Sequence, residues 1–165
     1  MIYDIYETTM AGTLVLAGDG ERLQHLNFVN GRHPLQVEDG WRRDPASFAG
    51  IKTQLADYFN GRRQAFDMAL DPVGTPFQMR VWAALREIPY GRTVSYQWVA
   101  QRIGAPTAGR AVGAANGRNP IAIIIPCHRV IGKHGGLTGY GGGLDLKQSL
   151  LQLENSQAGL SFDPA

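Results

Sequence analysis

The only cysteine of this 165-residue chain lies in a stretch whose residue types suit nucleophilic chemistry. Cys127 directly precedes His128 and Arg129. The thiolate is the reactive form of cysteine, and neighbouring cationic groups lower the pKa of a thiol, so this setting favours a reactive residue. The Cys-His pair alone fits a buried structural cysteine equally well, because free cysteine packs as a small apolar side chain and Cys/His sites are usually assembled from distant sequence.

The residues before the cysteine predict how it is positioned. Residues 121–125 form an apolar run of four isoleucines and one alanine, and Pro120 and Pro126 bound it. A short β-branched run of this kind is typical of a strand buried on both faces. Proline cannot extend the ladder, so it ends such a strand. We therefore expect a core strand that delivers one thiol to a fixed place.

Composition limits the classes of protein that this chain can represent. Hydrophobic residues make up 44% and charged residues 18%, which is ordinary for a globular protein. One cysteine excludes a disulfide framework and a cysteine-based zinc cluster. The first ten residues are polar and no apolar run is long enough to span a bilayer, so we expect a cytoplasmic protein. The net charge is only +2, so any nucleic-acid contact must come from a local patch.

The first half of the chain predicts an antiparallel sheet with one helix. Alternating apolar residues indicate strands at 2–8, 13–17, 23–29 and 66–70, and a helix begins at Ser47 or a neighbour and ends at Phe59. Residues 71–74 resemble a connector. Asp4 and the other scattered acids of this half are expected to be solvated. This half contains no catalytic constellation.

The second half predicts mostly helices. Thr75 and Pro76 are suited to begin a helix with an apolar face. Ser95 is suited to cap a second helix that ends near Ile103, and a Gly-Ala-Pro turn leads to a third helix over 108–116, which together form a helix-turn-helix. A last helix is expected over 145–155. The predicted fold class is α+β, with an N-terminal domain over 1–72 and a mostly helical domain over 73–165.

The helix over 108–116 is unusual for a protein that reads the major groove. It contains small residues, among them Ala111, Gly113 and Ala114, and one long cationic side chain, Arg110. Small residues allow close approach to phosphates and to the minor groove. They equally suit a tightly packed internal helix, and the residues alone leave both interpretations open.

A longer signature separates these alternatives. The sequence Pro-Cys-His-Arg-Val at 126–130, preceded by Asn119–Pro120 and followed by Gly-Tyr-Gly-Gly-Gly at 139–143, resembles the O6-alkylguanine-DNA alkyltransferase family. The resemblance is strong over about residues 75 to 155. It implies direct-reversal DNA repair, in which an alkyl group moves irreversibly from O6 of guanine to a cysteine after the nucleotide is flipped out of the duplex. It also implies a ribonuclease-H-like N-terminal domain, a monomer, no cofactor and no metal; acceptance of O4-alkylthymine stays open.

The resemblance assigns a role to individual residues. Cys127 is the nucleophile, His128 takes its proton and Glu154 orients His128. Tyr96 presses on a phosphate and donates a hydrogen bond to the guanine. Arg110 fills the gap left by the flipped nucleotide, and it contacts duplex DNA together with Ala111, Gly113 and Ala114, mainly through the minor groove and phosphates.

The same resemblance outlines a pocket for the base. Tyr140 stacks on the guanine from a glycine-rich lid, and a backbone group at Gly141 contacts O6, at a position where relatives carry serine. Carbonyl groups of Cys127 and Val130 accept from the exocyclic amine, and Asn119 braces the segment before the cysteine. Without the resemblance, Glu154 would be interpreted as a solvated charge at a helix end.

Three other functions fit parts of the sequence. A non-enzymatic lesion binder of the same fold would lack the cysteine, so Cys127 argues against it. A helix-turn-helix regulator needs base-reading side chains, and the helix over 108–116 offers few. A Cys-His hydrolase would turn over repeatedly, whereas an alkyltransferase stops after one equivalent.

Overall fold

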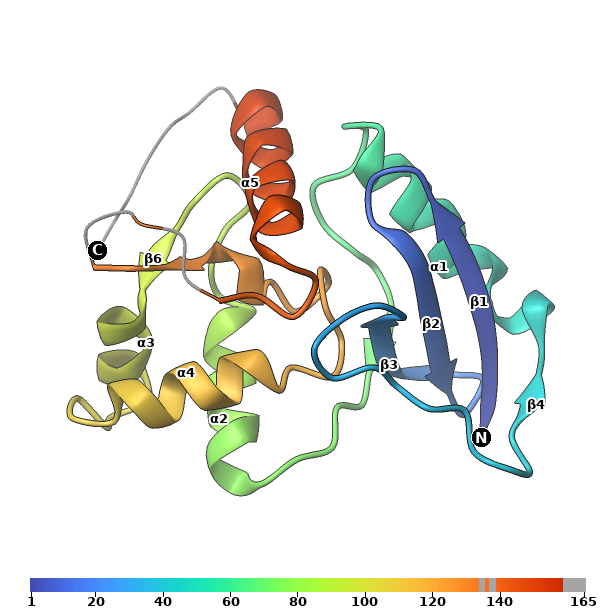
Figure 1. Cartoon of the computed structure of the whole chain (residues 1–165), viewed down its shortest axis with the longest axis horizontal. Helices are drawn as coiled ribbons and strands as arrows, with labels where there is room; N and C mark the ends of the chain where they lie inside the picture. Colours follow the sequence, from blue (N-terminus) through green and yellow to red (C-terminus); the bar gives the residue numbers. More distant parts are fainter. Residues whose placement is uncertain (134–135, 137–138, 159–165) are drawn as a thin grey trace.

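The chain folds into two halves that pack side by side (Figure 1). The computed structural model describes residues 1–133, 136 and 139–158. The sheet and helix α1 form one half, and helices α2 to α5 gather in the other (Figure 1). Part of the predicted glycine-rich lid, including Gly135, and residues 159–165 lie outside the described residues.

The sheet of the first half is built around the predicted meander. Strands β1 (Ile2–Thr8), β2 (Gly12–Gly18) and β3 (Arg22–Phe28) pair antiparallel, which confirms three of the predicted strands. Two short strands, β4 (Arg42–Arg43) and β5 (Ala69–Leu70), add to the edges in parallel, in the order β4-β1-β2-β3-β5. The sheet is therefore mixed rather than wholly antiparallel.

The strand predicted over 66–70 is only two residues long. The side chain of Gln54 binds both main-chain groups of Asp67. Its Oε1 accepts from the Asp67 N–H at 2.8 Å, and its Nε2 donates to the Asp67 carbonyl at 2.9 Å. Those groups are then not available to β3, so pairing is limited to the last two residues.

Helix α1 (Pro45–Phe59) covers one face of the sheet (Figure 1). It begins earlier than predicted, because Asp44 is the N-cap residue and Pro45 occupies the first turn. Ser47 instead donates to the Asp44 carboxylate at 2.9 Å. The apolar stripe faces the core as expected, with Ile51, Leu55 and Tyr58 fully or nearly fully buried.

Asp4 contradicts the prediction of a solvated charge. Its carboxylate is buried on β1, where it accepts from Arg43 Nε at 2.9 Å and pairs with Lys52 of α1. Burial alone would raise the pKa of Asp4, but the hydrogen bonds from Lys52 and Arg43 outweigh it and hold this pKa below the usual 3.8. This ion pair fastens α1 and β4 to the sheet.

The second half begins with helices capped as the sequence predicts. Helix α2 (Pro76–Leu85) has a capping box between Thr75 and Gln78. Ser95 ends the short strand β6 (Val94–Ser95) and caps α3 (Tyr96–Arg102) by accepting from the Trp98 N–H. Helix α4 (Gly109–Gly117) follows after a turn, which confirms the helix-turn-helix, and α5 (Leu144–Ala158) ends the described chain.

The apolar run over 121–125 is buried as predicted, but it is not a strand. Only Ile121 makes a bridge, to Leu26 of β3, and the chain then turns back, so that the Ile125 N–H donates to the Ile121 carbonyl at 3.0 Å. Ile123 adopts a φ of 71°, a conformation that β-branched residues rarely enter. Asn119 explains the turn, because its side chain accepts from the Ile121 N–H and donates to the Ile125 carbonyl.

Candidate functional site

Cys127 is presented by a single 3₁₀ turn at the boundary of the two halves. The turn (Cys127–Arg129) follows the buried Ile-rich segment and leads into β7 (Val130–Ile131), which pairs in parallel with β6. This pairing places Val130 opposite Val94 and Ile131 opposite Ser95, so the start of α3 lies near the cysteine turn. Cys127 is only 5% exposed.

A small cavity of about 40 Å³ lies against Cys127. Residues of both halves line it: Asn27, Phe28, Gly31, Arg32 and His33 from β3 and the loop after it, and Asn116, Gly117, Asn119, Ala122, Cys127, Tyr140 and Gly141 from the second half. One water needs roughly 10–15 Å³ of such volume, so the cavity has room for a few waters and not for a purine. The pocket in this structure is therefore too small to hold the base.

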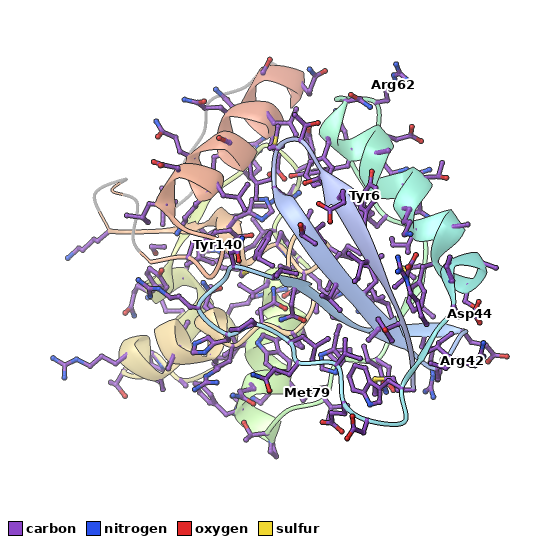
Figure 2. The ribbon with its side chains drawn as sticks, turned by 45° about the vertical axis from the view of Figure 1, so that its right-hand side comes forward. Tyr6, Arg42, Asp44, Arg62, Met79 and Tyr140 are labelled. Atoms are coloured by element: carbon purple, nitrogen blue, oxygen red, sulfur yellow. The ribbon has the colours of Figure 1, made fainter. Side chains whose placement is uncertain are left out.

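Tyr140 closes this cavity. Its ring is buried and meets Phe28 edge-on at 5.7 Å and His128 at 6.4 Å between ring centroids. In Figure 2 it lies near the middle of the molecule, whereas Arg42 and Arg62 project from the periphery. The lid residues 139–143 are tied to the first half, because the Arg32 N–H donates to the Gly141 carbonyl at 2.9 Å. A larger ligand requires this aromatic side chain to move.

The environment of the Cys127 thiol differs from the sequence prediction of a lowered pKa. Burial raises the pKa of this thiol above its usual 9.0, and a hydrogen bond from Asn119 and the charge of Lys147 act in the opposite direction without outweighing it. The side chains of its two neighbours in the sequence, His128 and Arg129, do not lower the pKa of the thiol, because both bind Glu154 instead. Burial therefore favours the protonated form of this thiol.

His128 is held by Glu154, the residue that the resemblance pairs with it. The imidazole Nε2 lies 2.7 Å from Glu154 Oε2, and both side chains are buried. An ionised carboxylate only accepts hydrogen bonds, so Nε2 carries a proton. Among the described residues, Nδ1 has no hydrogen-bond partner. With Nε2 committed to Glu154, Nδ1 is the ring nitrogen left to exchange a proton.

Glu154 is also the partner of Arg129, a contact that sequence reasoning missed. Arg129 donates through Nε and Nη2 to the two carboxylate oxygens at 2.8 and 3.1 Å, and through Nη1 to the Ile88 carbonyl at 2.7 Å. Burial alone would raise the pKa of Glu154, but His128 and Arg129 outweigh it and hold this pKa well below the usual 4.5. His128 and Arg129 therefore together keep Glu154 ionised in the interior.

Two further polar contacts in the interior were not found from the sequence. The Tyr58 hydroxyl donates to Glu154 Oε2 at 2.6 Å, and Lys147 Nζ donates to the Val130 carbonyl at 2.6 Å. Burial lowers the pKa of Lys147 to about 8. The position of Lys147 carried a signal in the sequence. Lys147, Leu150 and Glu154 recur at helical spacing, and all three face the protein interior from α5.

The residues that the resemblance assigns to DNA lie on and beside α4. Arg110, Ala111 and Ala114 are exposed, and Gly113 is half-buried, with the Tyr96 ring 3.9 Å from where a Cβ would lie. The outer side of α4 borders a hollow of about 540 Å³, which Arg32, His33 and Arg118 also line. Trp82 Nε1 donates to the Ala115 carbonyl at 2.9 Å and so fixes α4 on α2.

This surface is cationic and contains no opposing acid among its described lining residues. No ion pair involves Arg32, Arg110 or Arg118 within the part of the chain that the structure describes. Cationic side chains around a stripe of small residues are the features that phosphate and minor-groove contacts need. Because the net charge is low, any contact with nucleic acid was expected to come from a local cationic patch. This surface is such a patch, and it lies next to the cysteine pocket.

The remaining predicted pocket residues are distributed unevenly. Asn119 and Gly141 line the cavity with Cys127 and Tyr140. Val130 is fully buried in the β6–β7 pair and is not among the cavity lining.

Among the described residues no group of three His, Cys, Asp or Glu side chains could hold a metal ion. No described helix is both long and apolar enough to cross a membrane.

Comparison with known proteins agrees with this geometry. Residues 1–72 match the ribonuclease-like domain of 6-O-methylguanine DNA methyltransferase, and residues 76–156 match the DNA binding domain of the same family. The chain belongs to the 6-O-methylguanine DNA methyltransferase family.

Individual relatives are similar over nearly their whole length. A methylated-DNA--protein-cysteine methyltransferase of Methanosarcina acetivorans is 52% identical over 94% of this chain and 99% of its own. One from Mycobacterium tuberculosis is 54% identical over 89% and 88%. The crystal structure of Mycobacterium tuberculosis OGT in complex with DNA superposes with a TM-score of 0.89 at 50% identity, covering 95% of this chain and 94% of that one.

Proposed function

We propose that this protein repairs DNA by direct reversal, moving an alkyl group from O6 of guanine to Cys127. The observation that carries the proposal is that Cys127 lines a small pocket beside the helix-turn-helix and is followed in the chain by His128, which Glu154 holds. The relatives named as cysteine methyltransferases and the related structure in complex with DNA support the same activity and the same partner. We infer a division near residue 72, with the second half carrying the chemistry.

The chemistry follows from the positions of the protons. His128 Nδ1 accepts the proton of the Cys127 thiol, directly or through a water, while Glu154 stabilises the imidazolium. Sγ then attacks the alkyl carbon, the carbon–O6 bond breaks and its electron pair stays on the guanine. The thiol proton ends on guanine N1, so thiol and alkylguanine become thioether and guanine.

Stabilisation of the departing guanine comes from hydrogen bonds. Tyr96 and the backbone around Gly141 are the donors that the family resemblance assigns, and such bonds strengthen as charge develops on the base. A positioned general base contributes roughly 10²–10⁴-fold to a rate, so positioning and charge stabilisation must supply the rest. No described group is placed to remove a thioether, so each molecule acts once and needs no cofactor.

The target atom cannot be reached inside a duplex, so the nucleotide must be extruded. Extrusion costs a few kcal/mol, and less for a mispaired base. Arg110, which is exposed near the start of α4, offsets this cost by filling the gap, while Ala111, Gly113 and Ala114 let the helix approach the minor groove. We expect a monomer on duplex DNA, in a reducing compartment such as the cytoplasm, since the mechanism needs a free thiol.

The decisive experiment measures the intact mass of the protein after incubation with a duplex containing one O6-methylguanine. We expect one added methyl group, located on Cys127 and saturating at one per protein. Cys127→Ala should bind the same duplex and gain no mass. Binding without any mass gain in the wild-type protein would favour a non-enzymatic lesion binder, and repeated release of product would favour a hydrolase.

A further inference from the structure

Asn116 places an unsatisfied hydrogen-bond acceptor in the wall of the Cys127 cavity. The residue is 4% exposed and lines the cavity from the end of α4. Its Nδ2 donates to the Cys127 carbonyl at 3.3 Å, whereas its Oδ1 has no partner among the described residues. The reverse orientation of the amide would bring two acceptor oxygens together, so the hydrogen bond to Cys127 determines which atom is left without a partner.

An acceptor buried in this way needs a partner. Leaving a buried acceptor unsatisfied costs about 1–3 kcal/mol, and almost all such groups in folded proteins are paired. A ligand that enters this cavity is therefore favoured if it brings an N–H or O–H donor to Asn116. The chemistry of the ligand then decides which donor that is.

The proposed substrate has one kind of donor on its base. Alkylation of O6 removes the proton from guanine N1, and the ring nitrogens N3 and N7 only accept. The exocyclic amine on C2 is left as the sole source of N–H groups. An acceptor in the pocket wall can consequently bind the base only through this amine.

The carbonyl groups that the resemblance assigns to the amine already have donors. The Cys127 carbonyl accepts from the Val130 N–H and from Asn116 Nδ2, which uses both of its lone pairs. The Val130 carbonyl accepts from Lys147 Nζ at 2.6 Å, which leaves it one lone pair, but Val130 is not among the residues that line the cavity. Two other polar side-chain atoms of the described cavity lining lack a partner, Oδ1 of Asn27 across the pocket on β3 and the hydroxyl of Tyr140, which can donate as well as accept.

We propose that Asn116 Oδ1 accepts a hydrogen bond from the exocyclic amine of the flipped alkylguanine, and so helps the pocket to select guanine over purines that lack this amine. The inference rests on the proposed function and adds a specificity-determining residue to it. Asn116 joins the end of α4 to the Cys127 carbonyl, so reading the amine also orients the base relative to the turn that carries the thiol.

The test compares two free bases that differ only in the amine. O6-benzylguanine and O6-benzylhypoxanthine carry the same reactive benzyl carbon, and the second has hydrogen in place of the amine. The rate of benzyl addition to Cys127, followed by intact mass, is measured for the wild-type protein, Asn116→Ala and Asn116→Leu. Asn60→Ala, a change at the exposed end of α1, is the matched control.

We expect Asn116→Ala to react about tenfold more slowly with O6-benzylguanine and at an unchanged rate with O6-benzylhypoxanthine, the size expected for one hydrogen bond of about 1.4 kcal/mol. Asn116→Leu fills the space of the amide and should behave in the same way.

Equal slowing with both bases would overturn the proposal in favour of a purely structural contact with Cys127. A selective loss in Asn27→Ala instead would assign the amine to the opposite wall. Failure of the wild-type Cys127 to react with either base would contradict the proposed function itself.

Discussion

Glu154 Oε2 lies 2.7 Å from His128 Nε2, although 26 positions separate the two residues in the chain. The same carboxylate binds the guanidinium of Arg129, the next residue after His128. One side chain near the end of α5 therefore holds both residues that follow Cys127, and these two residues in turn keep its carboxylate ionised.

Glu154→Gln should destabilise the fold and slow alkyl transfer. The amide leaves Arg129 as a buried cation without a counter-charge, and breaking a buried pair in this way costs roughly 3–5 kcal/mol. The measurement is the free energy of unfolding in urea at pH 7, together with the rate of Cys127 alkylation by O6-benzylguanine.

Tyr58→Phe is the matched control for this change. It removes one hydroxyl donor from the same carboxylate and leaves the pairs with His128 and Arg129 in place. We expect a smaller loss, about 1.5–3 kcal/mol for a hydrogen bond to a charged group, and a nearly unchanged transfer rate. If the two variants lost the same stability and the same activity, the charge pair would not be the important contact.

The pH dependence of stability should carry the signature of Glu154. Its pKa is lower in the folded protein than the usual 4.5, so its stabilising effect is complete above about pH 4.5 and is lost as the pH falls through the folded pKa. The difference in Tm between the wild-type protein and Glu154→Gln should be largest at neutral pH and should narrow toward pH 3. A difference that stays constant over this range would contradict the assignment.

Arg110→Ala should slow transfer from duplex DNA by about tenfold and leave the reaction with O6-benzylguanine unchanged. The free base needs no extrusion, so only the duplex reaction loses the part of the extrusion cost that the arginine offsets, about 1.4 kcal/mol for a tenfold change. Arg62→Ala removes an exposed arginine on the far side of the molecule (Figure 2) and serves as the control for net charge. Equal losses on both substrates would argue against a role in flipping.

Local signals in the sequence were sufficient for most of the elements. The Thr75–Gln78 capping box and the Ser95 cap involve residues three positions apart, so they can be read directly from the chain. The alternation in residues 2–28 likewise determines the three-stranded meander. Each of these features depends on near neighbours and not on the rest of the fold.

The apolar run before Cys127 could not be interpreted in the same way. Its composition predicts burial, but burial alone does not distinguish a strand from a buried turn. The Asn119 side chain favours the turn, because it binds the Ile121 N–H and the Ile125 carbonyl. In a strand these main-chain groups would pair with a neighbouring strand. An asparagine that competes with a β-ladder is visible only after the chain has folded.

Buried polar residues were the other systematic omission. Asp4, Lys147 and Asn116 are of types that are usually exposed, and their burial depends on partners far away in the sequence or on the main chain. The family resemblance supplied Glu154, whereas Arg129 and Tyr58 as its partners required the three-dimensional structure.

Asn119→Ala should destabilise the protein by about 2–4 kcal/mol, because the Ile121 N–H and the Ile125 carbonyl each lose their partner in the interior. Its hydrogen bond also lowers the pKa of Cys127, so the variant thiol should react more slowly with iodoacetamide at pH 7. Urea unfolding measures the first effect, and exposed Asn60→Ala, expected within about 0.5 kcal/mol of wild type, is the comparison. Similar small losses in both variants would show that the turn does not depend on this side chain.

Lys147→Met should change how stability responds to alkaline pH. The pKa of Lys147 is about 8 in the folded protein and 10.5 as its ordinary value, so between these values the unfolded chain binds a proton that the folded chain has lost. The free energy of unfolding of the wild-type protein should therefore rise across this range, and methionine should abolish the rise. Exposed Lys133→Met should retain it. Unfolding in urea at pH 7.5, 9 and 10 gives the comparison, and parallel curves for all three proteins would contradict a buried titrating lysine. The same variant removes a positive charge near the thiol, so the midpoint of Cys127 alkylation by iodoacetamide should move to higher pH.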